Sequence, residues 1–202
     1  MNDVCDPDYA ALYKSIAARL NYMSPDRPDM QYGIKEVCRQ MADPTWRDLA
    51  RLKRMGRYLI GRPRLVIKYK FQGAMGEHKV RVLSDANWAG CRTTHKNTSG
   101  GCIYLGSHCV KIWSKTQHCI STSSAESEGV AMVKAVSEGL GIARILEEFD
   151  GVDVRVEVMA DAQAALGMIE REGVGKVRHV DVGISWIQLK CCLLYTSDAA
   201  DE

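Results

Sequence analysis

The chain has 202 residues, a length that suits one ordinary domain or one domain with an appended piece. Hydrophobic residues make up 46% and charged residues 26%, which is a globular composition and argues against a mostly disordered chain. No uninterrupted apolar run approaches the roughly 20 residues that a membrane helix needs, and the N-terminus lacks a basic start followed by an apolar stretch. The sequence therefore disfavours membrane and secretory roles.

The formal net charge of +2 conceals an uneven distribution. Residues 1–78 carry a net charge of +5, whereas the rest of the chain carries −3, and residues 47–70 hold nine basic residues against one acid. A basic segment beside an acid-leaning one predicts a phosphate-binding surface next to a site that uses carboxylates. A solvated helix face followed by an edge strand explains the same charge more simply, so charge alone does not decide between the two.

The eight cysteines do not form a recognisable ligand or disulfide pattern. None lies in a C-x-x-C pair, and no Cys/His spacing resembles a zinc site. Because no signal peptide precedes them, we interpret them as reduced structural thiols, of which Cys102 and Cys109 lie in apolar, strand-like runs.

The first seventy residues predict a small helical unit. A first helix begins at Asp6-Pro7 and runs through Leu20, a second covers residues 32–41, and a third follows Asp43-Pro44 and ends near Gly61. The third helix carries most of the basic residues on its outer faces. A strand over residues 65–69 completes this part.

The pattern then changes to alternating strands. Strands are expected over residues 79–84, 101–105 and 109–113, with a tight turn at residues 106–107 between the last two. A long helix is expected over residues 124–149, with an apolar stripe formed by Val130, Val133, Val136, Leu140 and Ile145. A strand over residues 154–159 and helices over residues 162–172 and 184–190 follow. This order predicts an α/β fold in which an antiparallel meander is extended by a parallel crossover strand.

Four acids, Asp85, Glu126, Asp161 and Asp181, lie where strands end or helices begin. Crowded carboxylates repel one another, but Mg²⁺ prefers carboxylate oxygen, and two such ions can activate a water and stabilise a phosphodiester's leaving oxygen. Each acid also has a simpler explanation. Glu126 fits a capping box with Ser123, the last two acids could be N-caps, and Asp85 could stabilise its own turn.

The segments around these acids resemble the ribonuclease H domain of copia-type retrotransposon polyproteins. Residues 82–90 read V-L-S-D-A-N-W-A-G and are similar to that family's S-D-x-D-W-A-G segment, with Asn87 where the family usually has an acid. Four further blocks follow in the family's order, namely T-S-G-G at 98–101, W-S-K-T-Q at 113–117, S-S-A-E-S-E at 123–128 and R-H-V-D at 178–181. The segment M-A-D-A-Q-A-A at 159–165 matches as well.

The helical part resembles the end of the adjoining reverse transcriptase, through L-N-Y-M at 20–23, R-P-D at 27–29 and Y-L-I-G at 58–61. We therefore expect a reverse transcriptase connection over residues 1–75 and a ribonuclease H-like domain over 76–191. Residues 192–202 look like translated sequencing-adapter read-through and are left out of the fold prediction. We expect the natural protein to continue beyond both ends of this chain.

The resemblance implies a two-metal ribonuclease H that uses Mg²⁺, with Mn²⁺ as the alternative. Asp85, Glu126, Asp161 and Asp181 would hold the metal, and His179 would assist proton transfer or product departure. The substrate would be the RNA strand of an RNA–DNA hybrid, and the partner the upstream polymerase part of the same polyprotein. Backbone contacts would come from the basic residues Arg47, Arg51, Arg54, Arg57, Arg62, Arg64, Lys68 and Lys115.

Such a protein would reside in a cytoplasmic retroelement particle or in the nucleus, and would not be secreted. Two alternatives stay open: a truncated remnant that binds nucleic acid without catalysis, and an integrase-type core, which the D-E-D-D order disfavours. Gly129, Gly139 and Gly141 interrupt the long helix at about 1 kcal/mol each relative to alanine, which predicts a less stable scaffold.

Overall fold

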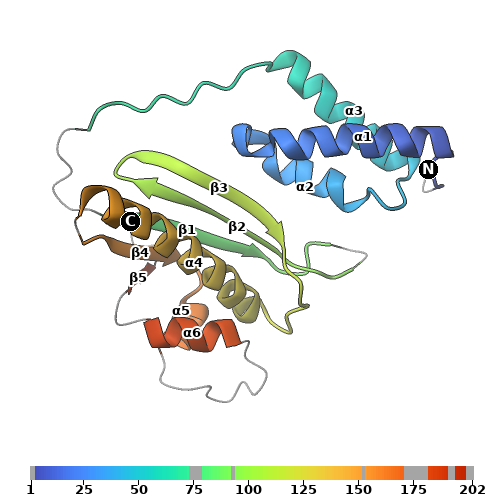
Figure 1. Ribbon diagram of the computed structural model, residues 1–202. Coiled ribbons are helices and arrows are strands. Elements are labelled where there is room, and N and C mark those ends of the chain that lie inside the picture. The colour runs from blue at the N-terminus through green and yellow to red at the C-terminus, as the bar shows by residue number, and fades with distance from the viewer. Residues whose placement is uncertain are drawn as a thin grey trace. The chain divides into compact units, whose positions relative to one another are not determined.

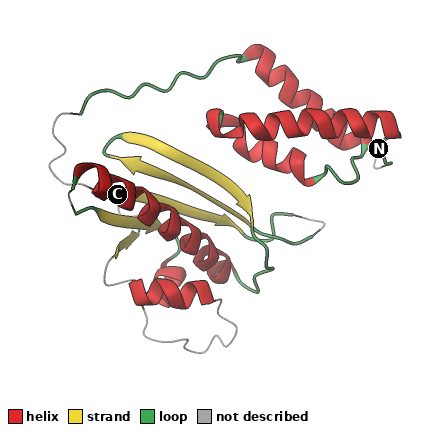
Figure 2. Ribbon diagram, viewed as in Figure 1, coloured by secondary structure: helices red, strands yellow, loops and turns green. Residues whose placement is uncertain are grey.

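The chain divides into a helical unit, Met1–Tyr69, and a sheet unit, Lys70–Glu202. The computed structural model describes residues 3–72, 79–91, 94–151, 153–170, 182–190 and 194–198. Figures 1 and 2 show the elements of both units. Each unit is described by itself below.

Three helices pack around an apolar centre in the helical unit: α1 (Pro7–Met23), α2 (Gln31–Arg39) and α3 (Trp46–Gly61). Two short 3₁₀ turns, Ser24–Asp26 and Pro28–Met30, connect the first two helices. The residues buried in the centre are Cys5, Tyr13, Ala17, Leu20, Met30, Ile34, Val37, Leu49 and Leu52. The three helices predicted from apolar spacing are thus present.

Two details of this unit differ from the prediction. Helix α3 is capped by Thr45, which together with Asp48 forms a capping box, so the helix begins after Thr45 and not at Asp43-Pro44. Residues 62–72 form neither helix nor strand, so the predicted strand over residues 65–69 is wrong. Apolar side chains of this segment, including Val66 and Phe71, are exposed, because no partner strand pairs with it among the described residues.

The sheet unit is built on a mixed sheet in the order β3-β2-β1-β4-β5. Its strands are β1 (Lys79–Asn87), β2 (Thr98–Leu105), β3 (His108–Thr116), β4 (Arg155–Ala160) and β5 (Leu194–Asp198). β1 to β3 form an antiparallel meander, and β4 pairs parallel to β1. The predicted α/β fold with three antiparallel strands and a parallel crossover strand is therefore confirmed.

A fifth strand lies at the edge of this sheet. β5 pairs parallel to β4 and comes from residues 192–202, which the fold prediction had left out. The sheet thus has one more strand than predicted. Its outer position does not alter the pairing of β1 with β4 at the centre of the sheet.

Helix α4 (Ser124–Asp150) lies across the sheet and contacts β1, β2 and β4, while α5 (Gln163–Ile169) and α6 (Val182–Lys190) pack beside it (Figure 1). The predicted stripe of α4 is correct in part: Val136 is buried and Val133 and Leu140 pack against the core, whereas Ile145 is exposed. The other buried residues of α4 are mainly small, with Met132 as the one further large apolar side chain among the described ones. A Cβ atom at Gly139 would lie 2.8 Å from Val82 Cγ2 and 3.0 Å from Val156 Cγ1. Small residues therefore let α4 approach the sheet closely.

No helix in the described part of the chain is both long enough and apolar enough to cross a membrane.

Candidate metal centre

Three carboxylates meet at one end of the central strands. Asp85 lies in β1, Asp161 directly follows β4, and Glu128 lies in the second turn of α4. Because Ser84 pairs with Ala160 in the parallel register, the next residue of each strand, Asp85 and Asp161, reaches the same edge. Each of the three offers one oxygen, and these oxygens all lie within 4.8 Å of one another. The fold thus assembles side chains that are 43 and 33 positions apart in the sequence.

Glu128 is the buried member of this acidic cluster, whereas Asp85 and Asp161 are exposed. Its Oε1 accepts a hydrogen bond of 3.1 Å from the N–H of Ala86. Its Oε2 is buried and has no hydrogen-bond partner among the described residues. Burial raises the pKa of Glu128 to about 7, the Ala86 N–H opposes that rise, and the charges of Asp85 and Asp161 add to it. Burial and the nearby acids therefore disfavour the ionised form of Glu128, and the single hydrogen bond from Ala86 does not compensate for this.

A divalent cation fits this donor set. Mg²⁺ and Mn²⁺ prefer carboxylate oxygen, and a cation would compensate the repulsion among three acids brought so close together. The unpartnered Glu128 Oε2 gives a second indication, because buried polar atoms in folded proteins are nearly always paired. The three residues Asp85, Glu128 and Asp161 could therefore hold such an ion.

Glu126, which the sequence predicts as a metal ligand, is not one of the three clustered carboxylates, whereas Glu128 is. Its carboxylate accepts from both the N–H and the hydroxyl of Thr122, at 2.6 and 2.9 Å. Its own N–H donates to Ser123 Oγ at 3.2 Å. Glu126 therefore caps the start of α4. Two positions along an α-helix correspond to a rotation of about 200°, so Glu126 and Glu128 cannot face the same side.

The sequence contained a signal for Glu128 that we missed. Glu128 lies four positions before Met132 and eight before Val136, and these three residues share the buried face of α4. An acid on a buried face demands an explanation, whereas an acid in the first turn is typical of an N-terminal cap.

Asp85 and Asp161 are thus the two predicted metal ligands that the structure brings together. Asp181 and His179 lie outside the described residues, so their roles stay predictions. Asp181 immediately precedes α6, which packs against α4.

The predicted nucleic-acid-binding residues of the helical unit are exposed. Those on α3 are Arg47, Arg51, Arg54 and Arg57, and those in the segment after it are Arg62, Arg64 and Lys68. Arg51 forms an ion pair of 3.0 Å with Asp48. The exposed face opposite the leucines of α3 is accordingly basic, as the charge pattern suggested.

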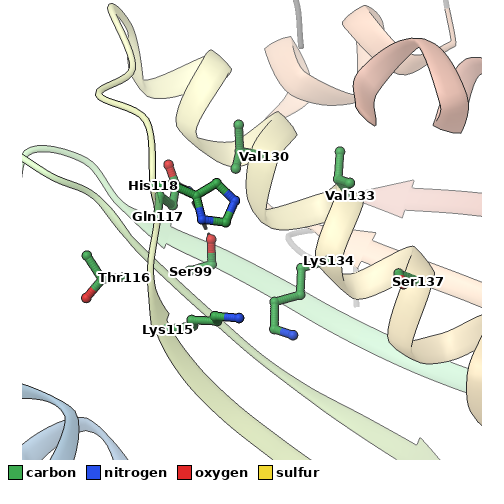
Figure 3. Close-up of a pocket in the computed structure, with 9 residues that line it drawn as sticks. All are labelled: Ser99, Lys115, Thr116, Gln117, His118, Val130, Val133, Lys134 and Ser137. Atoms are coloured by element: carbon green, nitrogen blue, oxygen red, sulfur yellow. Dashed lines mark hydrogen bonds between the residues drawn. The ribbon is translucent and has the colours of Figure 1, made fainter. Parts of the chain in front are cut away.

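Lys115 lies in the sheet unit, at a pocket of about 230 Å³ between α4 and the ends of β2 and β3. Figure 3 shows Val130, Val133, Lys134 and Ser137 on the α4 side of this pocket. The residues on the strand side are Ser99, Lys115, Thr116, Gln117 and His118. The pocket contains no carboxylate, so it is separate from the acidic cluster and has cationic side chains at its edge.

A mixed sheet of this strand order, with acids at the end of its central parallel pair, defines an α/β domain carrying a candidate metal centre. No protein-family model matches the chain. Sequence relatives exist nonetheless. Over 105 residues the chain is 36% identical to the retrovirus-related Pol polyprotein from transposon RE1 of Arabidopsis thaliana and 35% identical to that from transposon RE2. Each match covers 52% of this chain and 7% of the polyprotein.

A third relative is the uncharacterized mitochondrial protein AtMg00810 of Arabidopsis thaliana, 32% identical over 105 residues, or 52% of this chain and 42% of that protein. The chain thus matches less than half the length of each of these relatives. Its homologues are retrovirus-related Pol polyproteins of plant transposons together with this mitochondrial protein.

The structural neighbours are ribonuclease H domains. LC11-RNase H1, isolated from compost, gives a TM-score of 0.46 at 14% identity, covering 60% of this chain and 84% of that one. The N-terminal RNase H domain of rv2228c from Mycobacterium tuberculosis gives 0.44 at 12% identity, covering 61% of this chain and 85% of that one. The fold assignment rests on the strand order and register given above.

Proposed function

We propose that the chain is part of a retrotransposon Pol polyprotein, of copia type, whose ribonuclease H domain hydrolyses the RNA strand of RNA–DNA hybrids. One observation carries this proposal: Asp85, Glu128 and Asp161, from three separate elements, place oxygens within 4.8 Å of one another. An acidic cluster of this kind suits metal-assisted cleavage of a phosphodiester.

Asp85, Glu128 and Asp161 would hold the divalent ions, and Asp181 would complete the set. Bound Mg²⁺ or Mn²⁺ supplies the activation of a water and the stabilisation of the leaving oxygen. Glu128 must be ionised to act as a ligand, and the N–H of Ala86 orients its carboxylate toward Asp85. His179, just before Asp181 in the chain, would assist proton transfer or product departure.

The hybrid would be bound mainly through its phosphates. Lys115 would contact the backbone near the acidic cluster, because its strand, β3, and the strand β1 that carries Asp85 both pair with β2. The exposed arginines of α3 would add a sequence-independent, salt-sensitive contact. The polymerase part of the same polyprotein would be the partner, and the protein would act in a cytoplasmic particle or in the nucleus.

Cleavage of a labelled RNA–DNA hybrid in Mg²⁺ tests the proposal. The unsubstituted chain is expected to cut the RNA strand, leaving a 3′-hydroxyl, and Asp85→Asn or Glu128→Gln is expected to lower the rate at least about 100-fold. Glu126→Gln is the matched control, the same substitution two residues away, and is expected to keep most of the activity. Equal losses in Glu126→Gln and Glu128→Gln would contradict the assignment of Glu128.

A non-catalytic role in nucleic-acid binding is the second candidate. It is favoured by the exposed arginines of α3, which belong to the helical unit and do not depend on the acidic cluster. This function predicts salt-dependent binding of the hybrid without cleavage and without a calorimetric Mg²⁺ site. Detection of a Mg²⁺ site that Asp85→Asn removes would decide against it.

A further inference from the structure

A network of buried polar side chains connects the turn after β1 to the first part of α4, and the chemistry proposed above assigns it no role. Its four side chains are almost completely buried: Asn97, Ser99, Gln117 and Ser121 are between 0% and 5% exposed. Burying polar groups costs free energy unless they are hydrogen-bonded to one another. The network therefore needs an explanation beyond packing.

Asn97 is the first centre of the network. Its side-chain oxygen accepts from the N–H of Ala89 at 2.8 Å, and its amide nitrogen donates to Gln117 Oε1 at 3.0 Å and Ser121 Oγ at 2.9 Å. Ala89 has a φ of 50°, a backbone conformation that residues other than glycine rarely adopt. Asn97 thereby fixes the turn that follows β1, the strand that carries Asp85.

Gln117 is the second centre. Its amide nitrogen donates to Ser99 Oγ and to the carbonyl of Ser127, both at 2.9 Å. Its backbone N–H donates to the Asn97 carbonyl, also at 2.9 Å. Ser127 directly precedes Glu128, so Gln117 is hydrogen-bonded to the helix turn that carries the buried carboxylate. Replacing Asn97 or Gln117 with an apolar residue would remove all of these side-chain hydrogen bonds of the replaced residue.

The network thus connects the two elements whose carboxylates must meet. It reaches the β1 turn through Asn97 and the first part of α4 through Gln117, and the indole N–H of Trp88 adds a bond of 3.2 Å to the carbonyl of Ser121. Outer groups that orient metal ligands commonly change metal affinity 10- to 100-fold when removed.

We propose that Asn97 and Gln117 are positioning residues that hold Glu128 at the distance from Asp85 that a shared divalent ion requires. This inference rests on the proposed function. It assigns no contact between either amide and the substrate or the metal.

Calorimetric titration of the full chain with Mn²⁺, alongside thermal unfolding and hybrid cleavage, tests the inference. Gln117→Met removes all side-chain hydrogen bonds of Gln117 at nearly constant length and is expected to weaken Mn²⁺ binding at least about 10-fold. Raising the Mn²⁺ concentration should restore part of the cleavage rate. Ser121→Ala, which removes one bond to Asn97, provides a milder variant should Gln117→Met fail to fold, and is expected to weaken Mn²⁺ binding by a smaller factor.

Gln188→Met is the matched control, because Gln188 also donates from its side chain to a backbone carbonyl, that of Met168, at 2.8 Å. It should lower the melting temperature and leave Mn²⁺ affinity unchanged. If Gln117→Met and Ser121→Ala lower only the melting temperature, as this control does, the positioning role is overturned. If the unsubstituted chain binds no Mn²⁺ and cuts no hybrid, the proposed function itself fails, which is a separate result.

Discussion

Helices α3 and α4, one from each unit, bury their inner faces in opposite ways. α3 places Leu49 and Leu52 in the centre of the helical unit, and its buried acid, Asp48, is fully engaged: it accepts from the Thr45 N–H and hydroxyl and pairs with Arg51. α4 buries mostly small residues and an acid, Glu128, with one unpartnered oxygen. We therefore expect Asp48 to stabilise the helical unit and the ionised Glu128 to destabilise the metal-free sheet unit.

The size of the buried side chains determines how closely each helix packs against its neighbours. Large side chains hold a helix at a distance from its neighbours, and small ones let the backbones approach. Gly139 brings α4 against Val82 on β1 and Val156 on β4; Asp85 lies near the end of β1, and Asp161 directly follows β4. α4 thus combines close packing against the sheet with a buried carboxylate, that of Glu128, which has one unpartnered oxygen among the described residues.

The largest expected effect comes from pushing α4 away from the sheet. In Gly139→Ala the new Cβ would lie 2.8 Å from Val82 Cγ2, so the core must shift, at a cost of about 2 kcal/mol. Gly141→Ala is the matched control in the same helix, because nothing lies within 4 Å of its Cβ position. It is expected to stabilise the chain by about 1 kcal/mol. Urea unfolding measures both, and equal effects would refute the close-approach explanation.

The second effect is a pH dependence caused by Glu128. Its pKa is raised from the ordinary 4.5 to about 7, so between these values the folded chain binds more protons than the unfolded chain. The metal-free chain therefore loses stability as the pH rises from about 4.5 to 7, and the cost is fully present above pH 7. We expect about 2 kcal/mol, allowing for water at the exposed edge of the cluster.

Glu128→Gln removes this ionisation while keeping an oxygen for the Ala86 N–H. It should raise the free energy of unfolding at pH 8 by about 2 kcal/mol and leave it almost unchanged at pH 4. Thermal or urea unfolding of the metal-free chain at both pH values checks this. A loss of stability at pH 8 would mean that the carboxylate is better satisfied than its contacts indicate.

The sequence predicted the elements of both helices but not the difference between them. Apolar spacing locates α3 and α4 to within a few residues. It found Val133, Val136 and Leu140, which lie in or against the core, but missed the buried alanines and glycines of α4, because these residues are less hydrophobic. Hydrophobicity alone cannot reveal that a helix packs unusually close, since that depends on the strands opposite it.

The acidic cluster was predictable in part. Asp85 lies near the end of β1 and Asp161 directly follows β4, and the parallel register of these strands brings the two residues to the same edge. The choice between Glu126 and Glu128 depended on helix rotation, which the capping pattern obscured. Asn97 gave no signal, and Gln117 appeared only as the last residue of the W-S-K-T-Q block without a role, because polar residues in loops are usually solvated and only the fold reveals that both are buried.

The third prediction concerns Asp48, the buried acid of α3. Removing its charge should lower the free energy of unfolding, whereas Glu128→Gln should raise it. Asp48→Asn weakens the capping box and the ion pair with Arg51, and is expected to lower the free energy of unfolding by about 1.5 kcal/mol. Hydrogen exchange of α1, α2 and α3 measures this within the helical unit. A gain in stability, like that expected for Glu128→Gln, would remove the contrast between the two helices.

The smallest effect on stability is expected from the outer face of α3. Arg54 and Arg57 are exposed, and no ion pair is found for either within the described residues. The double substitution Arg54→Gln/Arg57→Gln should therefore change the free energy of unfolding by less than about 0.5 kcal/mol. If this face binds nucleic-acid phosphates, the same variant should reduce the slope of log affinity against log salt by roughly 2, since each phosphate contact contributes about 0.9. Fluorescence anisotropy of a labelled hybrid over a salt series measures the slope. An unchanged slope would mean that the basic face of α3 is merely solvated and that hybrid binding depends on the sheet unit. Lys115→Gln should then be the variant that lowers the affinity for the hybrid.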